Sequence, residues 1–328
     1  MIKTKLPHRR QFLHLASGVA AVPIMSRIAW AQAYPVRPIR FIVPLAAGGG
    51  LDFVARLTAD HLSRALGQQV IVENKAGAGG MLGIETAAKS PPDGYTVLIT
   101  TDGIASAPQI VRFNVDYVRT LVPVSHLVRT GHVIAVHPSL GVNSLSGLID
   151  LVKRKPGTAY ATSGQGTNQH FLGEWFADAA GIKLDHIPYR GAGQAINDLI
   201  AGHVTIAVLG PAAVIPHHRA GTLRIVAQSS QARSKSLPDV STIEESGLKG
   251  VVLETWQGAF VPEGTPAAII ARLGAEMRNA MLDPAVTQKL LDGAYDTVGG
   301  SADQLAELVR DDSAKYARLA RELKIKVD

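Results

Sequence analysis

Residues 40–52 read R-F-I-V-P-L-A-A-G-G-G-L-D, and this stretch is the strongest indication of how the chain folds. Residues 41–43 are aromatic or β-branched, which is typical of a buried strand, and Pro44 ends the strand because proline has no N–H for the ladder. Three glycines follow, and then an apolar stripe at helical spacing from Val54 to Leu66, with Gly67 as the expected helix end. A strand that leads into a helix through glycines predicts an α/β fold.

The turn between this strand and helix can bind an anion. Gly48, Gly49 and Gly50 allow backbone N–H groups to face a ligand, and the start of a helix attracts carboxylate or phosphate through its free N–H groups and dipole. Asp52 is expected to cap the helix. No Lys-Ser/Thr pair follows the glycines, which disfavours a nucleotide P-loop. A purely structural turn is the alternative interpretation.

A second strand-to-helix turn lies in the other half of the chain. Residues 159–162 form an expected strand, residues 163–170 read S-G-Q-G-T-N-Q-H, and an apolar helix follows until Gly181. Ser163 and Thr167 add hydroxyl groups to the free amides of Gly164 and Gly166, although Thr167 can equally be a helix N-cap and Ser163 a turn residue. Two such turns favour a binding role more than either one alone.

The first 33 residues have the pattern of a secretory signal peptide. Basic residues precede an apolar stretch at 12–25, and small residues follow it, so we expect cleavage after Ala31 or Ala33. The pair Arg9-Arg10 is also typical of a twin-arginine signal. Either export route predicts a periplasmic protein that is soluble after cleavage.

Composition excludes several classes of function. The net charge of +6 includes five basic residues of the leader, so 28 basic and 27 acidic residues remain and nothing indicates a nucleic-acid partner. The chain has no cysteine, which excludes disulfides, thiol chemistry and a lipidated cysteine anchor. No apolar run of about 18 residues predicts a membrane span. The remaining 295 of 328 residues suffice for two domains.

Strand-like runs alternate with helical segments along the chain. The runs lie at residues 69–72, 96–100, 133–136, 206–209 and 223–227. This alternation predicts an α/β fold with largely parallel sheets. Towards the C-terminus, Thr265 before Pro266 and Ser301 before an amphipathic segment are expected helix N-caps.

Short motifs in order along the whole mature chain carry a family resemblance. They are Y-P with R-P-I-R at 34–40, A-G-G with Asp52 and A-R at 55–56, L-G-Q before V-E-N at 66–74, G-A-G-G at 77–80, P-D-G-Y-T at 92–96, S-G-x-G-T-x-x-H at 163–170, P-Y-R-G at 188–191 and T-W at 255–256. Together they make the chain resemble the periplasmic solute-binding receptors of tripartite tricarboxylate transporters, also called Bug receptors.

The resemblance implies a type II-like periplasmic binding protein with two α/β lobes, each a mostly parallel sheet flanked by helices, and a ligand cleft between them. Lobe one is expected over residues 34–130 and 256–328, and lobe two over residues 131–255, with crossing strands near 127–136 and 252–261. The binding residues expected from the two turns and the resemblance are Leu45, Ala46, Ala47, Gly48, Gly49, Asp52, Thr100, Thr101, Ser163, Gly164, Gly166, Thr167, His170, Tyr189 and Leu209.

The implied function is capture of a small organic carboxylate by closure of the lobes, with delivery to the membrane permease subunits of the transporter. No cofactor and no metal site are expected, and the protein is expected to be a monomer. A receptor that presents its ligand to a sensor protein is an alternative with the same fold and site.

Four positions depart from the usual family pattern. Leucine and alanine stand at 45 and 46 where the family usually has phenylalanine and proline, Leu51 replaces a threonine, and Leu209 replaces an aspartate. Loss of the aspartate removes a partner for a ligand ammonium group, and leucines suit an apolar ligand body. We therefore expect an aromatic or otherwise apolar carboxylate rather than an amino acid.

Several residues leave two interpretations open. Thr100, Thr101 and Asp102 end a strand, where their side chains can face the ligand or cap the next turn, and the turn is slightly favoured. His170 can bind ligand or only stabilise its helix. Trp256 is expected to pack at the second crossing strand rather than contact ligand.

An enzyme is the competing class, and the residues argue against it. Ser163 lacks the G-x-S-x-G elbow because Ala161 occupies the position of the first glycine. No H-E-x-x-H motif exists, and the adjacent His217 and His218 are poorly placed to bind one metal and are read as a solvated helix end. The acidic residues show no spacing that nominates an acid–base pair.

Overall fold

A computed structural model describes residues 34–77, 80–109 and 120–323 of the chain. Arg37–Asp328 forms one compact unit, and Met1–Val36 forms another, of which only residues 34–36 are described. The predicted signal peptide lies outside the described residues. Within these ranges, no helix is both long enough and apolar enough to cross a membrane.

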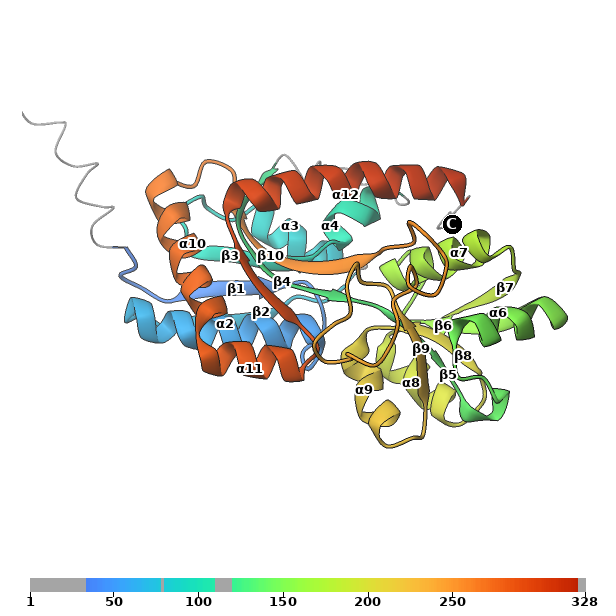
Figure 1. Cartoon of the computed structure of the whole chain (residues 1–328). Coiled ribbons are helices and arrows are strands. Elements are labelled where there is room, and N and C mark those ends of the chain that lie inside the picture. Colours follow the sequence, from blue (N-terminus) through green and yellow to red (C-terminus); the bar gives the residue numbers. More distant parts are fainter. Residues whose placement is uncertain (1–33, 78–79, 110–119, 324–328) are drawn as a thin grey trace, which may run out of the picture. The chain divides into compact units, whose positions relative to one another are not determined.

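The described residues form two β-sheets (Figure 1). Sheet A has the order β11-β4-β10-β3-β1-β2. Its strands are β1 Ile39–Val43, β2 Val70–Asn74, β3 Thr96–Thr101, β4 Leu121–Gly131, β10 Glu254–Pro262 and β11 Asp296–Gly300. Sheet B has the order β7-β6-β8-β5-β9. Its strands are β5 Val133–Val136, β6 Thr158–Thr162, β7 Leu184–Pro188, β8 Ile206–Leu209 and β9 Arg224–Gln228.

Both sheets are mixed, whereas the sequence predicted largely parallel ones. In sheet A, β1 is parallel to β2 and β3, but β10 is antiparallel to β3 and β4, and β11 is antiparallel to β4. In sheet B, β6 is parallel to β7 and β8, while β5 is antiparallel to β8 and β9. The parallel pairs are joined through helices. In the antiparallel pairs made by β5 and β10, one strand enters the sheet from the other sheet, whereas β11 pairs with β4 after helices α10 and α11.

Helices cover both faces of each sheet (Figure 1). Those packed on sheet A are α2 Gly50–Leu66, α3 Met81–Ala88, α4 Gly103–Ser106, α10 Ala267–Leu282, α11 Pro284–Asp292 and α12 Ala302–Glu322. Those packed on sheet B are α6 Leu145–Arg154, α7 Asn168–Ala180, α8 Ala192–Ile200 and α9 Pro211–Arg219. The apolar side chains of α6 and α7 form one core cluster with sheet B, and those of α8 and α9 form another.

Helix ends agree with the sequence at some positions and differ at others. Gly67 and Gly181 end α2 and α7 in the left-handed conformation, and Ser301 caps α12 in a capping box. The expected cap at Asp52 is wrong, because α2 begins at Gly50 and the Asp52 carboxylate accepts from the Gly48 N–H at 2.9 Å. Thr265 is not a cap either, since its hydroxyl donates to Pro262 O at 2.8 Å and Pro266 takes the cap position of α10.

The two sheets share one strand order, counted along the chain. Each sheet contains three parallel strands, which are β1, β2 and β3 in sheet A and β6, β7 and β8 in sheet B. In both sets the first strand along the chain, β1 or β6, lies between the other two. The chain therefore reverses direction across the sheet next to β1 and next to β6. Ligands of open α/β sheets bind at such reversal points, beyond the carboxyl ends of the strands. The two glycine turns leave β1 and β6 at these ends.

The chain passes between the sheets twice. It leaves sheet A through His132, which separates β4 from β5, and returns through the segment between β9 and β10. Sheet A therefore takes its strands from both ends of the described chain, and sheet B takes its strands from residues 133–228. A first lobe made of two separate segments of the chain, as predicted, would have its strands placed in this way. The lobe limits themselves stay a prediction.

Candidate functional site

The first loop, defined as residues 44–49, connects β1 to α2 and is held from both sides. Asn74 Nδ2 donates to Leu45 O at 3.0 Å, and Asp52 Oδ2 accepts from the Gly48 N–H and from Arg56 Nε, both at 2.9 Å. Gly48 has φ +81°, a conformation that favours glycine. Although burial opposes ionisation of Asp52, hydrogen bonds from Arg56, Gly48 and Asn74 lower its pKa. The loop is thus ordered around a carboxylate that stays ionised.

The amide groups of the first loop are largely available. Residues 45–50 are exposed, and the N–H groups of Ala46, Ala47 and Gly49 have no acceptor among the described residues. The first N–H groups of α2 follow directly, and a helix of 17 residues adds the positive end of its dipole. The first loop and the start of α2 can therefore accept an anion by backbone hydrogen bonds.

Two residues that the sequence analysis did not select lie against this helix start. A Cβ atom added to Gly50 would be 1.9 Å from the Tyr295 hydroxyl, so the phenol lies directly beside the first residue of α2. Gln257 lies close enough to the same phenol to affect its pKa, and the Gln257 Oε1 is buried without a partner. The only signal for Gln257 in the sequence is an amide within an otherwise apolar run of β10, and nothing local connects Tyr295 with Gly50.

The second loop, defined as residues 163–167, connects β6 to α7 and uses its own amide groups. Gly164 N donates to Thr162 Oγ1 at 3.2 Å, Gly166 N to His170 Nδ1 at 3.1 Å, and Ser163 N to Gln169 Oε1 at 3.4 Å. The first loop follows β1 and the second follows β6, which have corresponding places in their sheets, but the two loops differ in how many backbone N–H groups are free to bind a ligand. In the second loop they are already paired within the protein.

The hydroxyl groups of the second loop are also engaged. Thr167 caps α7, because its Oγ1 accepts from His170 N at 3.4 Å, and it donates to Gly164 O at 2.8 Å. Ser163 Oγ donates to Gln169 Oε1. The structural interpretations of Thr167 and Ser163 therefore hold for this conformation.

The other predicted residues are placed as follows. Thr100 is buried at the end of β3, and Thr101 Oγ1 accepts from Gly103 N at 3.1 Å, as expected for a turn cap. Tyr189 follows β7 and donates from its hydroxyl to Asp198 Oδ2 at 2.7 Å. Leu209 is fully buried in the core on the α8 and α9 side of sheet B, so its side chain faces no surface here. Trp256 packs at the crossing strand, as predicted.

Four histidines are held neutral by their surroundings. Burial lowers the pKa of His126, His132, His170 and His186 to about 4, and for His186 the neighbouring His170 lowers it further. The rings of His170 and His186 stack with centroids 3.9 Å apart. His186 Nε2 also contacts Thr162 Oγ1 at 2.7 Å, directly before the second loop.

These histidines predict a loss of stability in acid. Each histidine binds a proton in the unfolded state as pH falls through about 6.5, but in the folded state only near pH 4, so the unfolded state is favoured increasingly between these values. We expect the free energy of unfolding, measured in urea between pH 7 and pH 5, to fall. In His186→Gln the free energy of unfolding should fall less steeply with decreasing pH than in the natural protein, by up to about 1 kcal/mol per pH unit. Equal slopes for both proteins would contradict this assignment.

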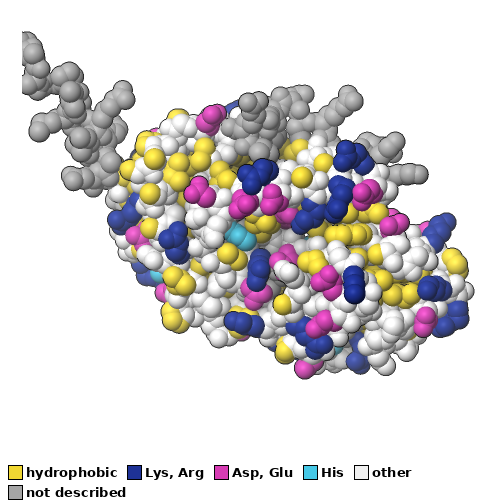
Figure 2. All heavy atoms as spheres, turned by 45° about the horizontal axis from the view of Figure 1, so that its top comes forward, with side chains coloured by type: hydrophobic (Ala, Val, Ile, Leu, Met, Phe, Trp, Pro, Cys, Tyr) yellow, Lys and Arg dark blue, Asp and Glu magenta, His cyan; other side chains and the backbone are white. Residues whose placement is uncertain are grey.

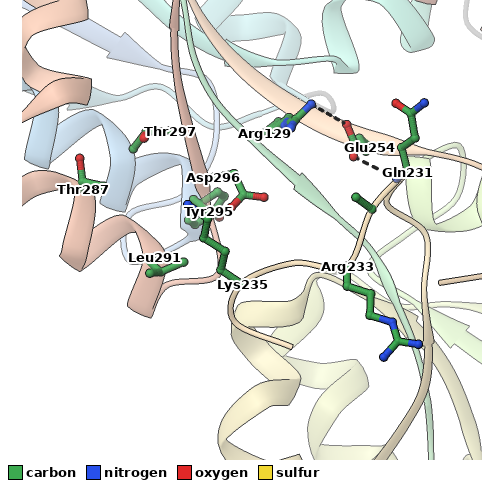
Figure 3. Close-up of a pocket in the computed structure, with 11 residues that line it drawn as sticks. Arg129, Gln231, Arg233, Lys235, Glu254, Thr287, Leu291, Tyr295, Asp296 and Thr297 are labelled. Atoms are coloured by element: carbon green, nitrogen blue, oxygen red, sulfur yellow. Dashed lines mark hydrogen bonds and ion pairs between the residues drawn. The ribbon is translucent and has the colours of Figure 1, made fainter. Parts of the chain in front are cut away.

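A cavity of about 350 Å³ shares Tyr295 with the start of α2 (Figure 3). It is lined by residues of β4, β10, β11, α11 and the segment after β9, among them Arg129, Glu254, Lys235 and Tyr295. Arg129 Nη1 is 3.8 Å from Glu254 Oε2, which neutralises part of the charge of the lining. None of the predicted binding residues lines this cavity. The cavity thus borders the start of α2 through Tyr295 without including the predicted binding residues.

Clusters of charged or metal-ligating side chains would be a second type of site. On the face shown in Figure 2, basic and acidic side chains are interspersed and form no field of one sign. Within the described ranges, no group of three or more His, Asp or Glu residues could hold a metal ion.

Comparison with known proteins agrees with this architecture. Residues 54–325 match the family model described as the tripartite tricarboxylate transporter family receptor. Protein BugT of Bordetella pertussis is 35% identical over 317 residues, which cover 94% of this chain and 95% of BugT.

Two similar solved structures have a bound dicarboxylate named with them. R. palustris Rpa4515 with adipate has a TM-score of 0.83 and 29% identity, covering 89% of this chain and 99% of that chain. MatC (Rpa3494) from Rhodopseudomonas palustris with bound malate has a TM-score of 0.78 and 26% identity, covering 87% and 99%. The structure of the periplasmic binding protein BugD has a TM-score of 0.79 and 29% identity, so the shared fold is that of periplasmic binding proteins. The enzyme interpretation is wrong, because the family is one of solute-binding receptors. The extent of these matches shows that the chain belongs to the tripartite tricarboxylate transporter receptor family.

Proposed function

We propose that this protein is a periplasmic receptor that binds a small organic carboxylate at the first loop and delivers it to the membrane permease of a tripartite transporter. The observation that carries the proposal is the set of unpaired, exposed N–H groups of Ala46, Ala47 and Gly49 at the start of α2. A carboxylate would supply acceptors for these N–H groups, and each charge-assisted hydrogen bond would contribute about 1.5–3 kcal/mol. The two similar dicarboxylate-bound structures support this ligand class.

The difference between the loops suggests an order of events. A carboxylate can bind the first loop without breaking any hydrogen bond within the protein. The second loop would have to exchange internal bonds, such as that of Ser163 with Gln169, for bonds to the ligand. We propose that the ligand binds the first loop and that closure then recruits Ser163, Gly164, Gly166 and Thr167. Only a ligand that contacts both loops favours the closed state.

We further propose that the ligand has an apolar body. Leu45 is 42% exposed beside the free amides and Leu82 is 51% exposed. Leu45 Cδ2 lies 3.9 Å from the position of a Cβ on Gly80, and Leu82 Cδ2 lies 3.4 Å from that of a Cβ on Gly77. The two leucines thus flank the same turn at the edge of the loop. Among the four departures from the family pattern, Leu51 and Leu209 are buried, so the exposed Leu45 and Ala46 support an apolar ligand body.

The test is thermal unfolding of the protein without its leader against adipate, malate, benzoate, aspartate, glucose and AMP. We expect adipate or benzoate to raise the midpoint by about 5 °C or more at concentrations near 100 times the dissociation constant, because a ligand of the folded state stabilises it. Stabilisation by aspartate without benzoate or adipate would contradict the apolar body. A shift with glucose or AMP and none with the acids would overturn the carboxylate site.

A substitution at the start of α2 tests whether the ligand that raises the thermal midpoint binds at the first loop. In Gly50→Ala the new methyl group meets the Tyr295 hydroxyl and displaces groups at the amide cluster. We expect at least tenfold weaker carboxylate binding by calorimetry, which is about 1.4 kcal/mol. Gly193→Ala is the control, since a Cβ there has no neighbour within 4 Å. Equal affinity of both variants would place the ligand elsewhere.

A further inference from the structure

A buried polar chain connects the end of β3 with the start of α7. Tyr316 Oη donates to Asp102 Oδ2 at 2.6 Å, and Asn168 Nδ2 donates to the same oxygen and to Thr255 Oγ1 at 3.1 Å. Thr255 Oγ1 lies 2.8 Å from His132 Nε2. These residues come from α7, β10, α12, the end of β3 and His132, which joins β4 to β5. The hydrogen-bonded residues therefore lie where the two sheets are joined.

Two oxygens in this chain lack a partner. Asp102 Oδ1 and Asn168 Oδ1 are both buried without a hydrogen bond to any described residue. As an ionised carboxylate, Asp102 could only accept, and the amide oxygen of Asn168 also only accepts, so neither oxygen could be the partner of the other. Two unpaired acceptors on adjacent, buried groups are costly, because neither recovers its hydration. One proton between them would satisfy both.

We propose that Asp102 and Asn168 form an acid–amide pair, in which Asp102 Oδ1 carries a proton and donates it to Asn168 Oδ1 while Oδ2 accepts from Asn168 Nδ2. The pair is a proton-binding site shared by the two halves of the structure. Oδ2 already accepts from Tyr316 and Asn168, which leaves Oδ1 as the oxygen that holds the proton.

The charges around Asp102 agree with this assignment. Burial, together with the Asp312 carboxylate of α12, raises the pKa of Asp102 to about 7, against the lowering effects of Tyr316, Asn168 and Lys315. His132, at the other end of the polar chain, is neutral, because burial lowers its pKa to about 4. No cation therefore neutralises Asp102 from the crossing strand.

The proton determines how firmly the two halves are linked. Asp102 follows Thr101 at the end of β3, and Asn168 follows Thr167 at the end of the second loop. The pKa of Asp102 in the folded state, about 7, is above its ordinary value of 3.8. The stabilisation by the proton is therefore complete below about pH 3.8 and is lost as the pH rises through about 7. Above pH 7 the pair keeps one hydrogen bond and gains a repulsion between oxygens. The link is thus weaker in mild alkali than in mild acid.

The test is infrared spectroscopy of the ligand-free protein between pH 5 and pH 9. We expect a carbonyl band of a protonated carboxylic acid that disappears with a midpoint near pH 7 and is absent in Asp102→Asn. Asp311→Asn is the control, because Asp311 is an exposed carboxylate on the same helix as Tyr316 and should leave the band unchanged. A spectrum without such a band at pH 5, or with an equal band in Asp102→Asn, would overturn the proposal.

Two further measurements separate pairing from burial alone. Asn168→Leu removes the acceptor of the proton, so the acid band should move to higher wavenumber, and a band at the unchanged position would refute the pair. Asparagine at 102 can donate to Asn168 Oδ1 at every pH. The thermal midpoint of Asp102→Asn minus that of the natural protein should therefore increase by about 3 °C or more when the pH is raised from 5 to 8. A constant difference across this range would also count against the proposal.

Discussion

Replacing Asp312 with alanine is expected to lower the free energy of unfolding by about 3 kcal/mol, because it removes one partner of a buried polar cluster. Trp256 Nε1 donates to Asp312 Oδ2 at 2.7 Å, and Lys315 Nζ lies 2.6 Å from Oδ1. Asp312 is 3% exposed and Trp256 2% exposed, so in the variant the indole N–H is left buried without its acceptor. The measurement is urea unfolding at pH 7, followed by tryptophan fluorescence and by circular dichroism.

Asp311 provides a matched control on the same helix. Its side chain is 66% exposed, and it lies 3.7 Å from Arg310, a pair of the kind that contributes little. Asp311→Ala should change the free energy of unfolding by less than about 0.5 kcal/mol. Similar losses in the two variants would show that the effect comes from helix α12 in general and not from the buried cluster.

Replacing Gly83 with alanine is expected to cost about 2–3 kcal/mol, because α3 packs against the start of the first loop without room for a methyl group. A Cβ at Gly83 would lie 2.6 Å from Pro44 Cα and 2.9 Å from Lys75 O. Both contacts are with backbone atoms, so neither can be relieved by a side-chain rotation. Thermal unfolding should show the loss, and carboxylate binding should weaken as well, since Pro44 begins the first loop.

Gly193 serves again as the comparison for this substitution. It lies within α8 and is exposed, so alanine should gain up to about 1 kcal/mol through its higher helix propensity. The two glycine-to-alanine changes in helices thus have opposite expected signs. A stabilised Gly83→Ala would mean that α3 and Pro44 can separate at little cost.

The strands and the two glycine turns could be predicted from local sequence. Residues 41–43 are aromatic or β-branched and lie within β1, and the predicted run at residues 133–136 is β5. Both turns lie where their glycines and flanking patterns predicted them, directly after β1 and directly after β6. These predictions succeeded because buried strands and left-handed helix ends are specified by residues that are close in sequence.

The contacts made by distant residues could not be predicted in this way. Asp52 has the sequence signal of a helix cap, but its carboxylate instead orders the first loop through Gly48 and Arg56. Tyr295 reaches Gly50 only because the segment after α11 is brought to the start of α2 in the fold. Whether Leu209 faces the ligand also depends on the packing of sheet B, which buries it. The resemblance supplied positions but not the orientation of their side chains.

The place of β10 within sheet A has a consequence for how the chain folds. β10 lies between β3 and β4, yet about 120 residues separate it from β4 along the chain, including all of sheet B. Sheet A therefore has a gap at its centre until residues 254–262 have been made and have come back to it. Sheet B uses one continuous segment and can close earlier. Such long-range pairing slows folding, so completion of sheet A should be the late step of maturation.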